Sequence, residues 1–360
     1  MSTKIPLLTD MSFISRIDNA IYESRRKSLQ AWHIAISSYP GLKRLEGNAF
    51  LMQISRLEAL LPPLTDEERN AAIDIVLSSG VYDKVGEKEE EKDSEFNYID
   101  ELVKELLRWF KEEFFKWVNK ADCRQCGNDA QESIRMLGVA KPFKPDHFEG
   151  KANTVEVYQC MKCNSRIEFP RYNDIRYLLR ERRGRCGEWN NCFIAILRSL
   201  DIDVRYIWNA EDHVWCEYYS SKLRRWIHLD SCENAYDQPL LYSDGWGKKM
   251  SYVFAVGRGY IIDVSAKYIG KDKPDQQLPR EKISEQDLKR FLALLNCRKL
   301  LQLEKMDMLR ETSHIMADFW SSRPETTEDS IKVEKDVDDN FKPRQSGSAE
   351  WTSKRGESGQ

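Results

Sequence analysis

The stretch GRCGEWNNCFIAILRSL, residues 184–200, decides the fold of this chain. A glycine-flanked turn leads into an apolar run that is long enough for a helix of about four turns. Cys186 stands at the start of that helix, where unpaired backbone N–H groups and the helix dipole favour an anion. The pattern therefore predicts a reactive thiolate on a turn that opens a helix.

Two strand-like segments follow, HVWCEYYS at 213–220 and RRWIHLD at 224–230. A short polar turn joins them, so we expect a β-hairpin. A hairpin centred after Ser221 places His213 directly opposite Asp230. An imidazole beside a carboxylate is an oriented general base, and together with the thiolate it predicts a cysteine hydrolase.

The alternation of side chains along a strand gives this hairpin two different faces. The apolar face, which we expect in the core, carries Val214, Cys216, Tyr218, Ile227 and Leu229. The other face is aromatic, acidic and imidazole-bearing: His213, Trp215, Glu217, Trp226, His228 and Asp230. We expect this polar face to accept a sugar or a peptide, although an ordinary half-buried hairpin has the same pattern. His228, opposite Trp215 in this register, is the alternative base.

Composition excludes several classes of protein. The chain has 360 residues, a formal net charge of −3 and 32% charged residues of both signs. The length allows one sizeable core with smaller modules, and no basic field favours nucleic acid as a partner. We expect no secretory signal and no membrane span. Nine cysteines at this spacing favour metal binding and catalysis over a disulfide framework, which predicts the cytosol, or also the nucleus.

Two CxxC pairs, Cys123 with Cys126 and Cys160 with Cys163, predict a metal site. Four thiolates suit a closed tetrahedral Zn²⁺ site with a structural role, here to clamp the intervening loop to the catalytic segment. Two separate redox motifs are the alternative, but neither pair stands between a clear strand and helix. His147 lies inside the loop, and we expect it at the surface.

Periodicity and charge divide the chain into six segments. We expect an α+β fold with an N-terminal helical arm and charged loop (1–95), a core helix (96–120), a zinc-binding subdomain (121–170), a catalytic core (171–275), C-terminal helices (276–320) and a disordered tail (321–360). The arm contains an amphipathic helix at 11–32, which either packs on its own domain or docks a partner. The charge run at 84–95 predicts a solvated loop.

The motifs GRCGEW, DVRYIWNAEDHVWCEY and RWIHLDSCE resemble the cytoplasmic peptide:N-glycanases, a family of transglutaminase-like deglycosylating amidases. The likeness extends to FPRYND, to DQPLLYSDGWGKKMSY, to the paired CxxC motifs and to SGSAEW near the C-terminus. The chain looks most like the short fungal form, whereas the first 95 residues and most of the tail match weakly.

The resemblance implies a papain-like/transglutaminase-like core with a zinc subdomain beside a deep cleft. It implies Cys186 as the nucleophile, His213 as the base and acid, and Asp230 as the residue that orients His213. It also assigns positions near the cleft that bind substrate or support activity: Arg205, Trp215, Glu217, Trp226, Glu233, Trp246 and Lys248.

The implied substrates are N-glycosylated unfolded proteins, which the family cleaves at the asparagine side-chain amide in glycoprotein quality control and ER-associated degradation. The implied partner is a ubiquitin-receptor shuttle protein of the proteasome. The triad alone leaves a transglutaminase, a thiol protease and a catalytically inactive binding scaffold open as alternatives.

Overall fold

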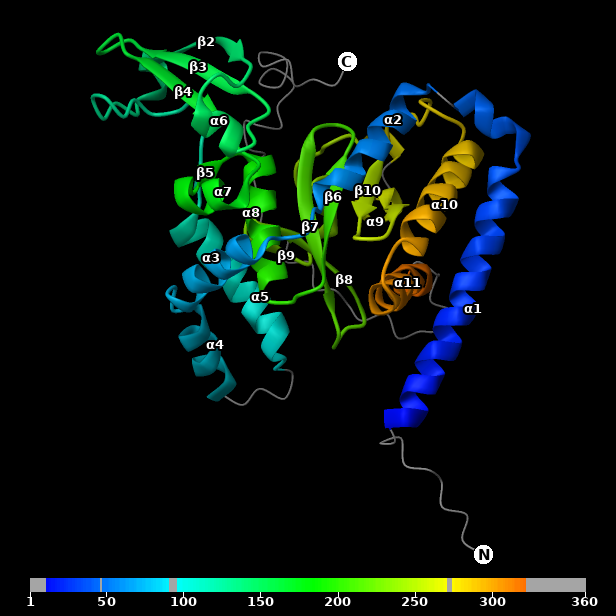
Figure 1. The fold of residues 1–360 in the computed structure, drawn as a ribbon. Helices are drawn as coiled ribbons and strands as arrows, with labels where there is room; N and C mark the ends of the chain where they lie inside the picture. Colours follow the sequence, from blue (N-terminus) through cyan, green and yellow to red (C-terminus); the bar gives the residue numbers. More distant parts are fainter. Residues whose placement is uncertain (1–10, 46, 91–95, 271–273, 322–360) are drawn as a thin grey trace, which may run out of the picture. The chain divides into compact units, whose positions relative to one another are not determined.

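The computed structural model describes residues 11–45, 47–90, 96–270 and 274–321 (Figure 1). Backbone contacts divide them into two units. The described part of the larger unit consists of Pro62–Val253 and Val264–Leu278. The smaller unit consists of the described residues up to Leu61, Phe254–Asp263 and the described residues from Pro279 onward. Every candidate site residue belongs to the larger unit.

The larger unit contains most of the helices: α3 (Asp66–Leu77), α4 (Val81–Glu90), α5 (Tyr98–Trp109), α6 (Pro145–Glu149), α7 (Ile175–Glu181), α8 (Cys186–Ser199) and α9 (Ser265–Tyr268). The charge run at 84–95 was expected to be a loop, and this is wrong up to Glu90, where α4 ends. Residues 91–95 lie outside the described residues. The helix expected over 96–120 is also shorter, because a π-helical turn at Phe110–Phe114 ends α5 before β1 (Lys116–Trp117).

Two antiparallel sheets lie in the larger unit. Four strands pair in chain order: β6 (Val204–Asn209), β7 (His213–Ser220), β8 (Arg225–Asp230) and β9 (Ala235–Tyr236). A separate sheet has the order β2–β3–β4, with β2 (Ile134–Ala140), β3 (Val155–Cys160) and β4 (Arg166–Pro170) (Figure 1). β5 (Arg183–Gly184) pairs in parallel with β1 directly before α8.

Helix α8 is the centre of the core. It packs along β6 and β7, while α3 and α7 also contact it. Its side chains Phe193, Ile196 and Leu197 are fully buried. The ring centres of Phe110 and Phe193 lie 5.1 Å apart. The predicted helix of about four turns from Cys186 is therefore confirmed.

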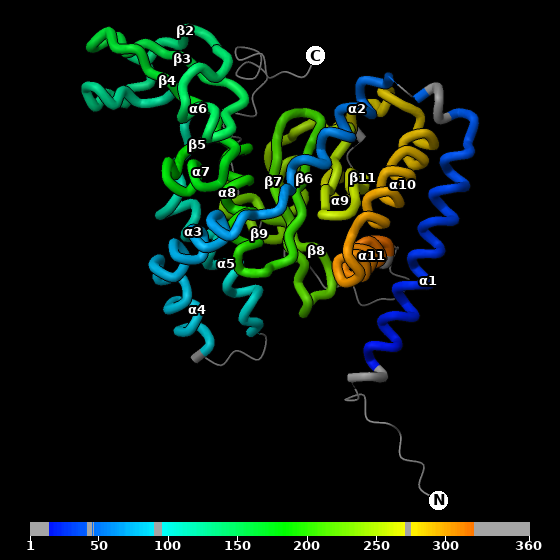
Figure 2. Tube along the Cα trace, viewed as in Figure 1, coloured from blue at the N-terminus to red at the C-terminus, as the bar shows by residue number. Residues whose placement is uncertain are grey.

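The smaller unit is mainly helical. It contains α1 (Met11–Ser37), α2 (Ala49–Arg56), α10 (Glu285–Leu301) and α11 (Lys305–Ser321), with a hairpin of β10 (Val253–Val256) and β11 (Ile261–Asp263). The helix predicted at 11–32 is confirmed, and it packs along α10 within this unit (Figure 2). The predicted tail lies outside the described residues except for Ser321. None of the described helices is long and apolar enough to cross a membrane.

Candidate active site

The turn before α8 depends on Gly184. A Cβ at this position would lie 2.4 Å from the Cβ of Glu188, so a glycine is needed for Glu188 to fold back over the turn. Glu188 Oε2 accepts a hydrogen bond of 3.0 Å from the backbone N–H of Arg185, which caps the helix. Cys186 is the first helical residue and its side chain is half-buried, as the sequence predicts.

His213 and Asp230 are joined by a hydrogen bond of 2.9 Å between Nε2 and Oδ2. This bond leaves Nδ1 of the ring for Cys186, the other group whose hydrogen bond and charge act on His213. Burial alone would lower the pKa of His213, but Asp230 and then Cys186 outweigh burial and raise that pKa to about 10. The ring therefore favours the imidazolium form, which is the form that stabilises a neighbouring thiolate.

Hydrogen bonds to both carboxylate oxygens stabilise the ionised form of Asp230. Burial favours its neutral form, but the hydrogen bond and charge of His213 outweigh burial and lower its pKa to about 2. Oδ1 accepts backbone N–H groups of Cys232 at 2.9 Å and Glu233 at 3.3 Å. The Glu233 side chain is itself 7% exposed, with a carboxylate oxygen 3.7 Å from Lys111 Nζ.

The predicted hairpin register is wrong by two residues. In the structure Glu217 pairs with His228, so His213 and Asp230 are diagonal neighbours and not directly opposed. A shift of two residues leaves each side chain on its own face of the sheet. The prediction that His213 and Asp230 share a face therefore survives, while His228 lies opposite Glu217 and not Trp215.

The polar face of the hairpin is buried, against the expectation that it is open to a ligand. Trp215, Glu217 and Trp226 are 1%, 0% and 4% exposed. Glu217 forms ion pairs of 2.5 Å with Arg205 and with Lys267, and the Arg205 guanidinium lies 4.3 Å from the centre of the Trp226 ring. Such burial fits support of the site and not direct contact with a ligand.

Trp246 and Lys248 lie beside the candidate triad and are only partly buried. The Trp246 ring centre is 5.4 Å from that of His213. Lys248 Nζ donates to the backbone carbonyl of Asp212 at 3.1 Å. Burial lowers the pKa of Lys248, while nearby negative charges, that of Cys186 among them, oppose the shift. Both side chains therefore keep some exposed surface beside the candidate triad.

Arg185, which precedes the candidate nucleophile, ties the turn to the three-stranded sheet. Its side chain is 2% exposed and forms a two-point ion pair with Glu156 of β3, at 2.7 Å for Nη1–Oε1 and 2.6 Å for Nη2–Oε2. Its Nε donates to the Val118 carbonyl at 2.9 Å. The sequence gives no signal for this pair, because 29 positions separate the partners and a single buried arginine has no periodicity.

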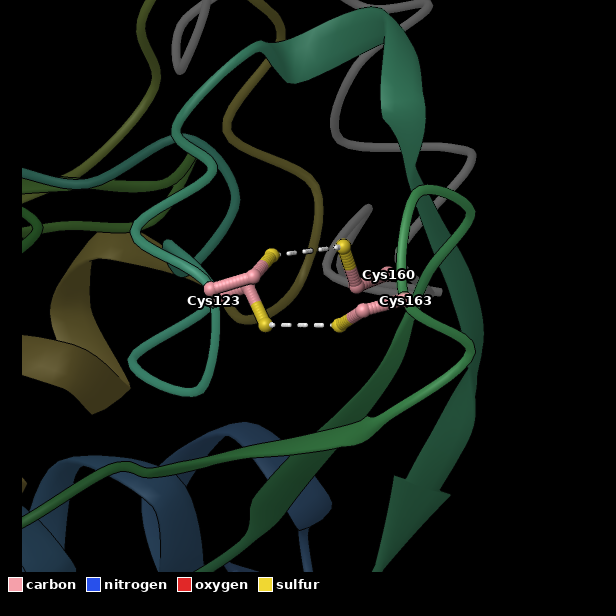
Figure 3. A group of neighbouring side chains, drawn as sticks. Cys123, Cys160 and Cys163 are labelled. Carbon is pink, nitrogen blue, oxygen red and sulfur yellow. Dashed lines mark hydrogen bonds between the residues drawn. The ribbon is translucent and has the colours of Figure 1, made fainter.

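The four cysteines of the CxxC pairs converge, as Figure 3 shows for Cys123, Cys160 and Cys163. Their sulfur atoms all lie within 4.8 Å of one another, with 3.6 Å between Cys123 and Cys163 and 3.7 Å between Cys126 and Cys160. A tetrahedron with Zn–S bonds of ~2.3 Å has sulfur atoms about 3.8 Å apart, so the four cysteines could hold a metal ion. His147 is not among them, and at 1% exposure it is not the surface residue expected.

Family models match two parts of the chain. Residues 138–231 match the transglutaminase-like superfamily, and residues 209–310 match the Rad4 transglutaminase-like domain, which confirms the predicted fold class. The solved structure of Rad4–Rad23 bound to a 6-4 photoproduct UV lesion aligns at 15% identity with a TM-score of 0.38, covering 84% of this chain and 61% of the other.

Two yeast proteins are much more similar in sequence. The peptide-N(4)-(N-acetyl-beta-glucosaminyl)asparagine amidase of Saccharomyces cerevisiae is 43% identical over 285 residues, which cover 77% of this chain and 76% of the relative. The protein of that name from Candida glabrata is 45% identical over 273 residues, with coverages of 73% and 74%. The chain therefore belongs to the peptide-N(4)-(N-acetyl-beta-glucosaminyl)asparagine amidase family.

Proposed function

We propose that this protein is an amidase that removes N-linked glycans from unfolded glycoproteins. It cuts the side-chain amide of the glycosylated asparagine and leaves an aspartate. The observation that supports the proposal is the position of His213 between two partners. Its Nε2 is hydrogen bonded to Asp230 at 2.9 Å, and its ring interacts by hydrogen bond and charge with Cys186 at the start of α8. The named relatives, at 43% and 45% identity, support the choice of substrate.

The first half of the reaction forms a thioester. The Cys186 thiolate attacks the amide carbonyl carbon while the thiol proton stays on Nδ1 of His213. Backbone N–H groups at the start of α8 stabilise the oxyanion. His213 then gives its proton to the departing glycosylamine nitrogen, so the C–N bond breaks and the acyl group remains on the sulfur.

The second half hydrolyses that thioester. A water molecule attacks the carbonyl carbon and loses a proton to Nδ1 of His213. The tetrahedral adduct collapses with cleavage of the C–S bond, which releases the aspartate side chain and restores the Cys186–His213 pair. Asp230, with its lowered pKa, stays ionised and stabilises the imidazolium in both halves.

The residues around the triad divide into two groups by exposure. We assign Trp246 and Lys248, which keep exposed surface beside His213 and Cys186, to contact with the glycan or its peptide. An indole face suits the apolar side of N-acetylglucosamine, whereas Glu233 is 7% exposed and falls in the buried group. The buried group is proposed to support the site from beneath: Arg205, Trp215, Glu217, Trp226 and Glu233.

We further propose that the four-cysteine cluster binds one structural Zn²⁺. Four thiolates fill a tetrahedral site and leave no position for substrate, so the metal takes no part in the chemistry. The cluster includes Cys160, at the end of β3, and the same strand supplies Glu156, the ion-pair partner of Arg185. A metal that holds β3 thereby also positions the turn that carries Cys186.

Partner and location are proposals that rest on general features. A ubiquitin-receptor shuttle protein of the proteasome would link glycan removal to degradation, and α1 offers it exposed apolar side chains at Trp32 and Ile34, 63% and 69% exposed. The spacing of the cysteines favours metal binding over disulfides, which supports the cytosol, or also the nucleus.

Mass spectrometry of the products formed from a denatured N-glycoprotein tests the function. We expect release of the whole glycan with conversion of asparagine to aspartate by the natural protein, and no release by the Cys186→Ala variant. New amine crosslinks would support a transglutaminase, and cuts in the chain would support a protease. Binding of the glycoprotein without any product would support the inactive scaffold.

The control variant is Cys192→Ala on the same helix. Cys192 is fully buried and distant from the helix start, so its loss should cost stability and leave the activity per folded molecule unchanged. Equal activity of Cys186→Ala and the natural protein would overturn the proposal.

A further inference from the structure

The hydrogen bonds around Asp230 continue beyond His213. Tyr242 Oη donates to Asp230 Oδ2 at 2.8 Å, the same oxygen that is bonded to His213. His228 Nε2 lies 2.8 Å from Tyr242 Oη. At the far end, the backbone N–H of Gln238 donates to His228 Nδ1 at 3.3 Å. A continuous chain of hydrogen bonds therefore leads from the backbone to the acid of the triad.

The hydrogen bond from Gln238 determines which group donates in each hydrogen bond between His228 and Asp230. A backbone N–H can only donate, so His228 Nδ1 accepts and its neutral ring carries the proton on Nε2. That Nε2–H donates to Tyr242 Oη, and the hydroxyl donates its own proton to Asp230. The assignment of this tautomer follows from the hydrogen-bond partners.

Burial keeps both side chains neutral. It lowers the pKa of His228 to about 4 and raises the pKa of Tyr242 well above its usual value. Both residues are fully buried. Aromatic contacts also fix the position of Tyr242. Its ring centre lies 4.2 Å from that of Trp215 and 5.2 Å from that of His213, which it meets edge-on.

Several other titratable groups face this chain. Asp230 interacts electrostatically with His213 and Cys216 from β7, with His228 from β8 and with Tyr242. Those that act on His228 are Asp230, Lys267, Glu217 and Asp237. The negative charges among them oppose the lowering of the His228 pKa, and burial still outweighs them.

We propose that Tyr242 and His228 are positioning residues for the reaction, which fix the rotation of the Asp230 carboxylate so that Oδ2 faces Nε2 of His213. Two donors hold Oδ2 and two backbone N–H groups hold Oδ1, so the carboxylate cannot rotate without losing hydrogen bonds. The same geometry argues against His228 as the base, because its Nε2 donates to Tyr242 and its Nδ1 accepts from the backbone. The effect on turnover rests on the proposed function, whereas the effect on Cys186 does not.

Tyr242→Phe tests the proposal because it keeps the ring and removes only the hydroxyl. We expect kcat/KM for deglycosylation to fall about 10- to 100-fold, mostly in kcat, as is typical when a group that orients a reactive residue is lost. We also expect alkylation of Cys186 by iodoacetamide at about pH 6 to slow by about 10-fold. The lost donor no longer stabilises ionised Asp230, which supports the imidazolium that faces the thiolate.

Two substitutions of His228 separate positioning from proton transfer. In His228→Gln the side-chain amide can still donate to Tyr242, so this variant should lose much less activity than His228→Leu. If His228 instead carried a proton in the reaction, glutamine and leucine would both abolish activity, and the proposal would fail.

Tyr218→Phe is the matched control. Tyr218 is also buried and donates to a carboxylate, that of Asp100 at 2.9 Å, on the opposite face of the hairpin. Its loss should lower the unfolding temperature and leave the rate of Cys186 alkylation unchanged. An alkylation rate that does not change in Tyr242→Phe, or that falls equally in Tyr218→Phe, would overturn the proposal. Alkylation needs no substrate, so it gives this answer even for a protein that fails to deglycosylate.

Discussion

The two sheets of the larger unit keep their shape by different means. The three-stranded sheet β2–β4 has a small core, made by Val118, Ala121, Cys123, Ile134, Tyr158, Cys160, Ile167 and Phe169. Its edge strand leaves Leu137 and Val139 more than half exposed. In the sheet that contains β6–β9, strand β8 is buried from Trp226 to Asp230. The small sheet is therefore the part that the proposed Zn²⁺ would cross-link, whereas the large sheet is fixed by packing and by buried hydrogen bonds.

Removal of the metal should show the difference between the two sheets most clearly. A small sheet whose core includes two of the ligands cannot bury enough apolar surface without the ion. We expect a chelator to abolish hydrogen-exchange protection in β3 and β4 and to abolish deglycosylation, and added Zn²⁺ to restore both. Protection in β7 and β8 should outlast that in β3. A metal-free preparation, verified by elemental analysis, that stays folded and fully active would contradict the account.

The ion pair between Arg185 and Glu156 is the next largest test, because it joins the small sheet to the catalytic turn. Glu156→Gln removes the carboxylate that pairs with the buried guanidinium of Arg185, and also with Arg171 at 3.2 Å. This change should lower the free energy of unfolding by about 3–5 kcal/mol. Denaturation in urea measures this loss.

An exposed ion pair provides the matched control for that substitution. Asp201 pairs with Arg69 at 2.6 Å, but the two side chains are 81% and 39% exposed. Asp201→Asn should cost less than about 1 kcal/mol, and asparagine tolerates the left-handed backbone at this position. Equal losses in the two variants would show that the Arg185 pair is no more important than a surface contact.

The pH dependence of stability reports on the buried hydrogen bonds of the large sheet. The pKa of His213 is raised from 6.5 to about 10, so its pairing stabilises the fold fully below about pH 6.5 and is lost as the pH rises through about 10. The pKa of Asp230 is lowered from 3.8 to about 2, so its contribution is complete above about pH 4 and is lost as the pH falls through about 2.

His213→Asn should therefore cost the most stability, about 2 kcal/mol, between about pH 4 and pH 6.5, where both contributions are complete. The difference from the natural protein should shrink toward pH 10. Unfolding curves at a series of pH values measure it, and a difference that grows above pH 8 would contradict the assigned charges.

Local patterns in the sequence predict much of this molecule. Period-two alternation assigns His213 and Asp230 to one face of a hairpin, and the CxxC spacing alone identifies the four cysteines whose sulfur atoms converge. The register fails because the turn ends at Arg224 in a left-handed conformation, φ 52°. Such turns usually carry a glycine or an asparagine as their signal, and an arginine gives none.

Contacts between distant positions could not be predicted in this way. Lys267 reaches Glu217 across 50 positions, and Tyr242 reaches Asp230 from a loop with no period of its own. A polar strand face looks open to solvent until the partners that bury it are known. For that reason the alternation finds the correct face and gives the wrong environment for Trp215 and Glu217.

The rate of Cys186 alkylation by iodoacetamide at about pH 6 shows whether His213 activates the sulfur, because an ordinary cysteine is almost wholly protonated at that pH. We expect the natural protein to react at least about 10-fold faster than the His213→Ala variant, since only the former pairs the sulfur with an imidazolium. Equal, slow rates in the two proteins would contradict this expectation.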